Sequence, residues 1–133
     1  MKTNDTQFAP HLAIRVLRPA ITFYETALGA LTHRTWENPD GSIHVAEMSL
    51  HGLLFHVHEE TPRDNQLSPE TVSSTSVVIG VFVPNPDELY EKAVAAGATI
   101  VSPMQDYDYG YRQATILDPF GHQWLIQKKI QGR

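Results

Sequence analysis

The sequence contains no cysteine among its 133 residues. It therefore cannot form disulfides, use a catalytic thiolate or bind zinc through sulfur, and it suits a reducing compartment such as the cytoplasm. Basic residues are also few, since ten Lys and Arg stand against fifteen Asp and Glu, for a net charge of −5. Nucleic acids and anionic membranes usually attract proteins with a broad basic surface. We therefore expect no nucleic acid and no membrane among its partners, and a small molecule instead.

Long apolar runs are missing as well. No stretch reaches the roughly 20 apolar residues that span a bilayer, and the segment Met1 to Pro10 is too polar for a signal peptide. No nucleophile elbow, glycine-rich phosphate loop or dinucleotide-binding motif stands on a suitable element. A chain of 133 residues with 41% hydrophobic content can bury a sizeable core. We predict a single cytoplasmic domain over residues 1–133.

The most informative stretch runs from Asp118 to Trp124. Pro119 presets the backbone angle φ, and Gly121 supplies a conformation that other residues resist, so this stretch predicts a tight turn. The apolar run that begins at Trp124 predicts the last strand of the chain.

The same order of elements is expected in both halves of the chain. The first half predicts a strand over 11–16, a helix over 19–28 and strands over 30–36, 42–50 and 53–58. The second half predicts a strand over 77–83, a helix over 86–96 and strands over 99–102, 111–117 and 124–128. The segment 59–76 has the polar, proline-containing composition of a long exposed loop. We therefore predict two βαβββ modules, about 9–58 and 77–129, joined by a linker of about 59–76.

Each module would form an open sheet whose helix covers one face and whose other face needs a partner. Two such sheets can curl around a cleft. The sequence thus predicts an α+β fold in which curled mixed sheets surround a cleft and the helices lie outside.

Three stretches closely resemble the vicinal oxygen chelate superfamily, which includes glyoxalase I, bleomycin resistance proteins and dioxygenases. They are Phe23-Tyr24 to Leu28-Gly29, Asp40-Gly41, and Asp118 to Trp124. The resemblance covers nearly the whole chain and is strongest to the bacterial PhnB-like branch. It implies the paired βαβββ fold, a homodimer and, in many members, a divalent metal in the cleft.

Metal-using members of that superfamily take four ligands from the first and last strands of their two modules. The corresponding positions here fall on His11 and His56 in the first module and on Val78 and Leu125 in the second, with Ala9 as a competing alignment for the first position. Val78 and Leu125 have no lone pair to donate. Because His56 and His58 share a strand face, His58 could act as a third donor. Zn, Ni, Fe or Mn held by His11, His56 and His58 is one hypothesis, and a chance pair among seven histidines is the other.

Catalytic candidates are His56 and Glu47, either of which could abstract a proton. Glu47 is either a buried carboxylate with a raised pKa or a solvated edge residue, and we favour the solvated interpretation. Arg112 lies where PhnB-like relatives carry Trp-Gly-Asp-Arg, whereas this chain has Tyr-Gly-Tyr-Arg. Arg112 would bind a ligand anion at the rim of the cleft, brace the Asp118 turn or pair with Asp106.

The two-residue period of a strand places a mostly apolar set of side chains on the same face as the two candidate histidines. The ligand-binding candidates are His11, His56, His58, Phe82, Arg112, Gln123 and Leu125. The missing ligand positions favour a small-molecule binding or sequestering protein of the bleomycin resistance type. The alternative is a metal-dependent lyase, isomerase or dioxygenase that acts on vicinal oxygens with an incomplete or atypical site. Glyoxalase I activity is not expected.

Overall fold

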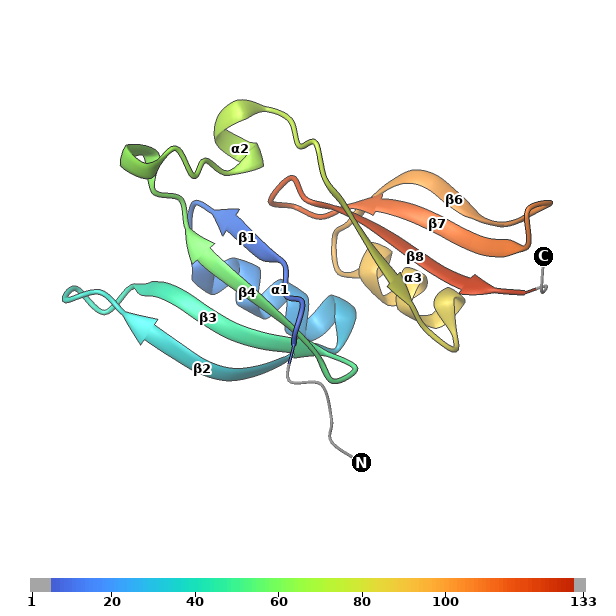
Figure 1. The fold of residues 1–133 in the computed structure, drawn as a ribbon, viewed down its shortest axis with the longest axis horizontal. Helices are drawn as coiled ribbons and strands as arrows, with labels where there is room; N and C mark the ends of the chain where they lie inside the picture. The colour runs from blue at the N-terminus through green and yellow to red at the C-terminus, as the bar shows by residue number, and fades with distance from the viewer. Residues whose placement is uncertain (1–5, 131–133) are drawn as a thin grey trace.

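The protein consists of two four-stranded sheets, each with one longer helix, in a computed structural model that describes residues 6–130 (Figure 1). The first module contains β1 (His11–Ile14), α1 (Leu17–Leu28), β2 (Leu31–Glu37), β3 (Ile43–Leu50) and β4 (Leu53–Glu59). The linker carries η1 (Pro62–Asp64) and α2 (Pro69–Val72). The second module contains β5 (Val78–Phe82), α3 (Pro86–Ala95), β6 (Thr99–Tyr107), β7 (Tyr111–Leu117) and β8 (Gln123–Lys129). Residues 1–5 of the polar segment Met1 to Pro10 lie outside the described residues.

The two modules have the same topology. The strand order is β1-β4-β3-β2 in the first sheet and β5-β8-β7-β6 in the second. In each sheet the first strand runs parallel to the fourth, and the other neighbours are antiparallel. The mixed sheets and the repeated order confirm the α+β fold of two βαβββ modules.

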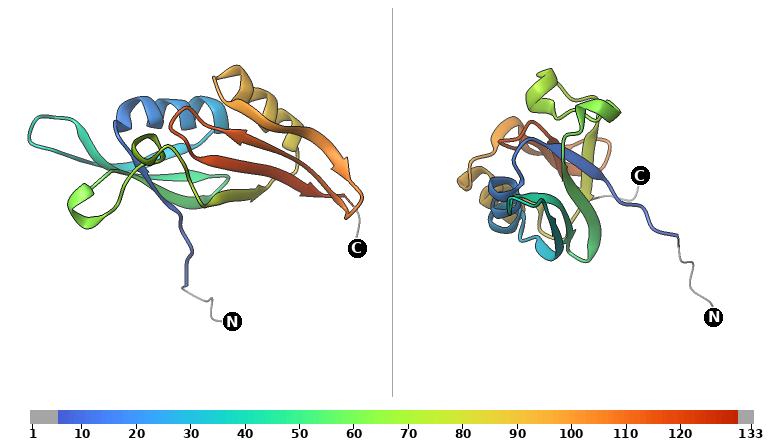
Figure 2. Two further views of the ribbon diagram at one scale, coloured as in Figure 1. Left: turned by 90° about the horizontal axis from the view of Figure 1, so that it is seen from above. Right: turned by 90° about the vertical axis from the view of Figure 1, so that its left-hand side faces the viewer.

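The two longer helices lie on the same side of the sheets and pack against each other (Figure 2). α1 ends at Gly29, whose φ of 67° is the left-handed conformation that glycine adopts without strain. α3 begins with Pro86, and the side chain of Asn85 caps it by accepting a hydrogen bond from the amide of Glu88 at 3.3 Å. The opposite faces of both sheets are covered by neither α1 nor α3, and we call them the helix-free faces. No helix between residues 6 and 130 is long and apolar enough to cross a membrane.

β6 differs most from its predicted bounds, because it continues past Ser102 to Tyr107. It is an edge strand, and its register with β7 shifts on both sides of Ser102. An edge strand with such irregularities tolerates Pro103, which has no amide hydrogen to donate to a neighbour. Part of the stretch between the predicted strands 99–102 and 111–117 is therefore strand.

A buried carboxylate joins the two modules. Asp118 is 2% exposed, and its Oδ2 accepts hydrogen bonds from the hydroxyl of Tyr24 at 2.6 Å and the indole of Trp124 at 2.9 Å. Its Oδ1 accepts bonds from the backbone amides of Phe120 and His122. Because Tyr24 belongs to α1 and the acceptor to the β7–β8 turn, this network fixes one module against the other.

Candidate functional site

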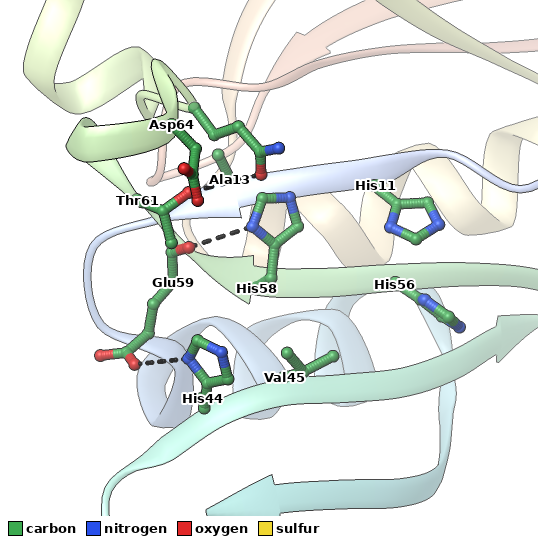
Figure 3. A pocket seen from close by; sticks show the side chains of 10 residues that line it. His11, Ala13, His44, Val45, His56, His58, Glu59, Thr61 and Asp64 are labelled. Atoms are coloured by element: carbon green, nitrogen blue, oxygen red, sulfur yellow. Dashed lines mark hydrogen bonds and ion pairs between the residues drawn. The ribbon is translucent and has the colours of Figure 1, made fainter. Parts of the chain in front are cut away.

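Three imidazoles gather on the helix-free face of the first sheet (Figure 3). β1 and β4 run in parallel with His11 directly beside His56, and the centroids of these two rings are 4.5 Å apart. The His58 ring lies 6.2 Å from that of His11. The intervening residues Leu12 and Val57 are buried under α1, so the alternation of the two strands turns the histidines away from the core.

A cavity of about 610 Å³ opens beside these histidines. It is lined by His11, Ala13, His44, Val45, His56, His58, Glu59, Thr61, Asp64 and Gln66. Most of these residues come from β1, β3 and β4, and the last three come from the linker. The cavity is large enough for a small organic molecule, and its wall offers both hydrogen-bonding and apolar groups.

Neighbouring groups shift the pKa of two side chains that line the cavity. Burial, followed by the neighbouring His56 and His58, lowers the pKa of His11, which favours its neutral form. Glu59 accepts hydrogen bonds from Asn38 at 2.9 Å and from His44 at 3.0 Å, and these bonds lower its pKa. The site thus combines an imidazole whose lowered pKa favours the neutral form with a carboxylate whose lowered pKa favours the charged form.

The two catalytic candidates of the first module are neighbours. Glu47 stands directly opposite His56 in the antiparallel pair of β3 and β4, so both side chains lie on the helix-free face. Glu47 is half-buried, so it is neither the fully buried carboxylate nor the fully solvated edge residue that the sequence allowed. It does not line the cavity described above.

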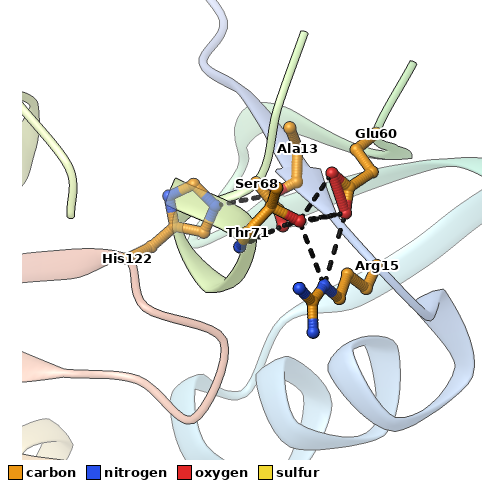
Figure 4. Close-up of polar contacts among 6 residues, drawn as sticks. All are labelled: Ala13, Arg15, Glu60, Ser68, Thr71 and His122. Carbon is orange, nitrogen blue, oxygen red and sulfur yellow. Dashed lines mark hydrogen bonds and ion pairs between the residues drawn. The ribbon is translucent and has the colours of Figure 1, made fainter. Parts of the chain in front are cut away.

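The linker is tied to the first sheet by a polar network around Glu60 (Figure 4). The carboxylate of Glu60 accepts hydrogen bonds from the hydroxyls of Thr71, at 2.7 and 2.8 Å, and of Ser68, at 3.1 Å. Arg15 donates from Nε to the Thr71 hydroxyl and lies 3.5 Å from the same carboxylate. These bonds tie the start of α2 to Glu60, just after β4, and the linker between them forms one wall of the cavity.

The second module also contacts the linker and β1. His122 donates from Nε2 to the carbonyl oxygen of Ala13 at 3.0 Å (Figure 4). A side chain at Gly121 would place its Cβ 2.6 Å from the Cβ of Pro69, and Gly121 has a φ of 92°. Both the close approach and the positive φ therefore require glycine at this point of the turn.

The ligand-binding candidates of the second module share the helix-free face of their own sheet. Val78 pairs with Gln123, Gly80 with Leu125, and Phe82 with Gln127. None of these residues lines the histidine cavity. The candidate residues thus form two groups, one on each sheet. In the second group neither the Val78–Gln123 pair nor the Gly80–Leu125 pair offers a metal ligand from both of its residues.

Arg112 does not line the histidine cavity, and of the contacts predicted for it the structure shows the pair with Asp106. It shares a strand face with the buried residues Ala114 and Ile116, and therefore points to the α3 side of the sheet. Its guanidinium donates to both carboxylate oxygens of Asp87, at 2.8 and 2.7 Å, and to Asp106 at 2.9 Å. These bonds raise its pKa further, and they engage the donors that an anionic ligand would need.

The candidate metal ligands do not form a complete site. Among residues 6–130, no three His, Asp or Glu side chains are placed so that they could hold one metal ion together. The Nδ1 atom of His58 lies 3.0 Å from the carbonyl oxygen of Glu59, which it contacts as a donor. Zinc and similar ions normally need three protein ligands at a catalytic site, so the donor set of His11, His56 and His58 does not fit such an ion.

The sequence patterns did not predict that the linker forms a wall of the cavity. Thr61 and Gln66 form an isolated backbone bridge that folds the linker back over the sheet. No hydrophobic period marks this fold, because it depends on the hydrogen bonds of Glu60 to residues eight and eleven positions later. The one local signal is the Ser68-Pro69 pair, which is typical of a helix start.

Comparison with known proteins extends these observations to a family. The model of the Glyoxalase/Bleomycin resistance protein/Dioxygenase superfamily matches residues 9–126. An uncharacterized protein of Mycobacterium bovis is 29% identical over 130 residues, which cover 96% of this chain and 86% of that protein. An uncharacterized protein of Mycobacterium tuberculosis H37Rv has the same identity, with 76% of its length covered.

Solved structures show the same fold. TioX from Micromonospora sp. ML1 superposes with a TM-score of 0.73 and 26% identity, covering 93% of this chain and 98% of TioX. A glyoxalase-related enzyme from Fulvimarina pelagi gives a TM-score of 0.69 at 21% identity, with 95% of this chain and 89% of that chain covered. The second match is below the identity at which function can be compared, and it supports the fold alone.

Proposed function

Because the chain belongs to the Glyoxalase/Bleomycin resistance protein/Dioxygenase superfamily, we propose that it binds or sequesters a small molecule in the cavity beside His11 and His56. The observation that carries the proposal is the cavity itself, about 610 Å³ in volume, with three imidazoles fixed on paired strands at its side. Rigid strands position polar groups better than loops do, which lowers the cost of ordering them around a ligand.

The lining favours an uncharged or weakly charged organic ligand with a few polar atoms. Neutral His11 can donate from one ring nitrogen and accept at the other. Ala13 and Val45 offer apolar contact, and Gln66 adds an amide that both donates and accepts. A planar or aliphatic molecule with one or two hydrogen-bonding groups matches this wall.

Metal-dependent lyase, isomerase or dioxygenase chemistry is the alternative that the superfamily allows. It would require a Lewis-acidic ion held by the chain's own donors. His11, His56 and His58 do not form a three-ligand set, and Val78 and Leu125 offer no donor from the second module. The binding function is therefore preferred, with His56 and Glu47 as the residues that would move a proton if a metal-free reaction occurs.

We also propose that the chain belongs to the PhnB-like branch and lies in the cytoplasm. The Asp40-Gly41 stretch supports the branch, and the lack of cysteine suits the compartment. The loss of the acidic residue before Arg112 is a departure from the branch, and the pairing of Arg112 with Asp87 shows what the arginine contacts instead.

The ligand site can be tested by NMR. A fragment library screened by amide chemical shifts is expected to give hits that perturb β1, β4 and the linker, because these elements build the cavity. Changing His56 to Ala should weaken those hits about tenfold, the effect of losing one buried hydrogen bond. His33→Ala, which removes an imidazole from β2 outside the cavity, should leave them unchanged. Hits confined to the outer surfaces of α1 and α3 would contradict the assignment.

We further propose a homodimer in which the helix-free sheet faces are covered by a second copy. Exposed apolar side chains on these faces support it, since Leu31, Val78 and Phe82 are 62%, 48% and 53% exposed. Light scattering coupled to size-exclusion chromatography is expected to give twice the chain mass of 14.9 kDa at micromolar concentration. A monomer at that concentration would contradict the dimer while leaving the fold intact.

A further inference from the structure

A second cavity, of about 390 Å³, lies between the two modules, where the linker passes the edge strand β1. Part of its wall comes from β1, part from linker residues between 67 and 76, and part from Ile79 and His122 of the second module. Among the described residues, no Asp, Glu, Lys or Arg lines it. An ion would gain no charged partner there to offset its loss of water, so the wall favours an uncharged molecule.

His122 is held in a fixed position at this cavity. Its backbone amide donates to Oδ1 of Asp118 at 3.0 Å, and its carbonyl oxygen accepts from the amide of Asp118 at 2.8 Å. Its side chain donates from Nε2 to the carbonyl oxygen of Ala13 (Figure 4), and the residue is 9% exposed. A side chain fixed in this way costs little further ordering when a ligand binds.

The bond to Ala13 also determines which nitrogen of His122 accepts. A carbonyl oxygen only accepts, so Nε2 carries the proton, and in the neutral ring Nδ1 has a lone pair. Between residues 6 and 130, every fully buried side-chain nitrogen or oxygen has a hydrogen-bond partner, whereas Nδ1 of His122 has none. Nδ1 is therefore not fully buried, and its ring lines the cavity. The cavity thus contains an acceptor whose position and tautomer are both set by the fold.

We propose that this cavity binds a small uncharged molecule with an apolar body and one hydroxyl or N–H group, which donates to Nδ1 of His122. Leu67, Pro69 and Ile79 offer apolar contact to the body of such a ligand. A ligand of the same shape without the donor would displace water from Nδ1 and leave it unpaired. Phenols and aliphatic alcohols belong to this class of ligand.

The site is distinct from the histidine cavity, although His11 and Ala13 line both. The linker residues of the histidine cavity end at Gln66, and those of the second cavity begin at Leu67. α2 contacts β1 and lies between it and the β7–β8 turn, so the second cavity is at the edge of the first sheet (Figure 1). The proposal therefore goes beyond the function proposed above, and either site can fail its test without the other.

The test compares phenol with anisole, which has nearly the same size and shape but no hydroxyl to donate. In NMR titrations of the full chain, phenol is expected to shift the amide signals of residues 67–77 and of His122, because they border the cavity. It should bind there about fivefold more tightly than anisole, the effect of one hydrogen bond. Nitrogen NMR of the imidazoles is expected to show a proton on Nε2 of His122 and none on Nδ1, and the Nδ1 signal should move as phenol binds.

His122→Phe keeps an aromatic ring without its nitrogens and should abolish the preference for phenol over anisole. His33→Phe is the matched control, because it removes an imidazole of β2 that does not line the cavity, and it should keep that preference. If His122→Phe does not fold, the nitrogen signals of the original chain still decide. Equal affinities for the two probes, or an Nδ1 signal that phenol does not move, would overturn the proposal. Shifts confined to β4 and residues 61–66 would place phenol in the histidine cavity and would also contradict it.

Discussion

Replacing Asp118 with Ala is expected to lower the free energy of unfolding by about 3–5 kcal/mol. The carboxylate is 2% exposed and accepts four hydrogen bonds. Without it, the hydroxyl of Tyr24, the indole of Trp124 and two backbone amides lose their acceptor in the interior. Each buried donor left without a partner costs about 1–3 kcal/mol, and partial relaxation of the turn reduces the sum.

Urea unfolding followed by tryptophan fluorescence measures this loss. Asp118→Asn keeps the shape and one acceptor oxygen, so it should lie between the Ala variant and the original chain, and it serves if the Ala variant does not fold. Asp40→Ala is the matched control, because Asp40 occupies a similar turn between β2 and β3 but caps only Ser42 at the surface. Comparable losses for Asp118→Ala and Asp40→Ala would mean that the buried network does not hold the modules together.

The order of helices and strands could be predicted because it depends on local chemistry. Gly29 and Gly121 have positive φ angles at chain reversals, and the Asn85 side chain caps a helix within its own first turn. Each of these signals acts over a few residues. Their repetition in the same order along the chain was enough to predict two equal modules.

The link between the modules could not be predicted in that way. Tyr24 and Asp118 are 94 residues apart in the sequence, and nothing near either residue indicates the other. In the sequence, Asp118 is only the first residue of a turn. Its burial depends on how α1 packs beside the β7–β8 turn, and neither the helical nor the strand period encodes that packing.

The histidine site was predictable only in part. The strand period places His11 and His56 on one face, and the parallel register makes them neighbours. The linker wall with Thr61 and Gln66 was missed, because the polar composition of its segment is that of an exposed loop. Its ordered path depends on hydrogen bonds to Glu60 that join distant positions. Composition indicates whether a segment is exposed to water, but it does not indicate which distant side chains the segment contacts in the folded chain.

The free energy of unfolding is expected to fall in alkaline solution, because Tyr24 has a raised pKa in the folded protein. Burial, then the charge of Asp118 and its hydrogen bond with the phenol, raise the pKa of Tyr24 well above its ordinary value. The folded protein therefore retains a proton that the unfolded chain releases near pH 10. This contribution to stability is complete below about pH 10 and is lost as the pH rises toward the pKa of the folded state, by about 1.4 kcal/mol per pH unit.

The Tyr24→Phe variant separates this effect from that of the other titrating groups. At neutral pH it should be less stable by about 1–3 kcal/mol, because Asp118 loses one buried donor. Above pH 10 its free energy of unfolding should fall less steeply than that of the original chain, since the phenylalanine has no proton to lose. Urea unfolding at several pH values between 8 and 11 gives both slopes. Equal slopes would show that Tyr24 ionises alike in the folded and unfolded chains, and that its bond to Asp118 does not keep the phenol neutral.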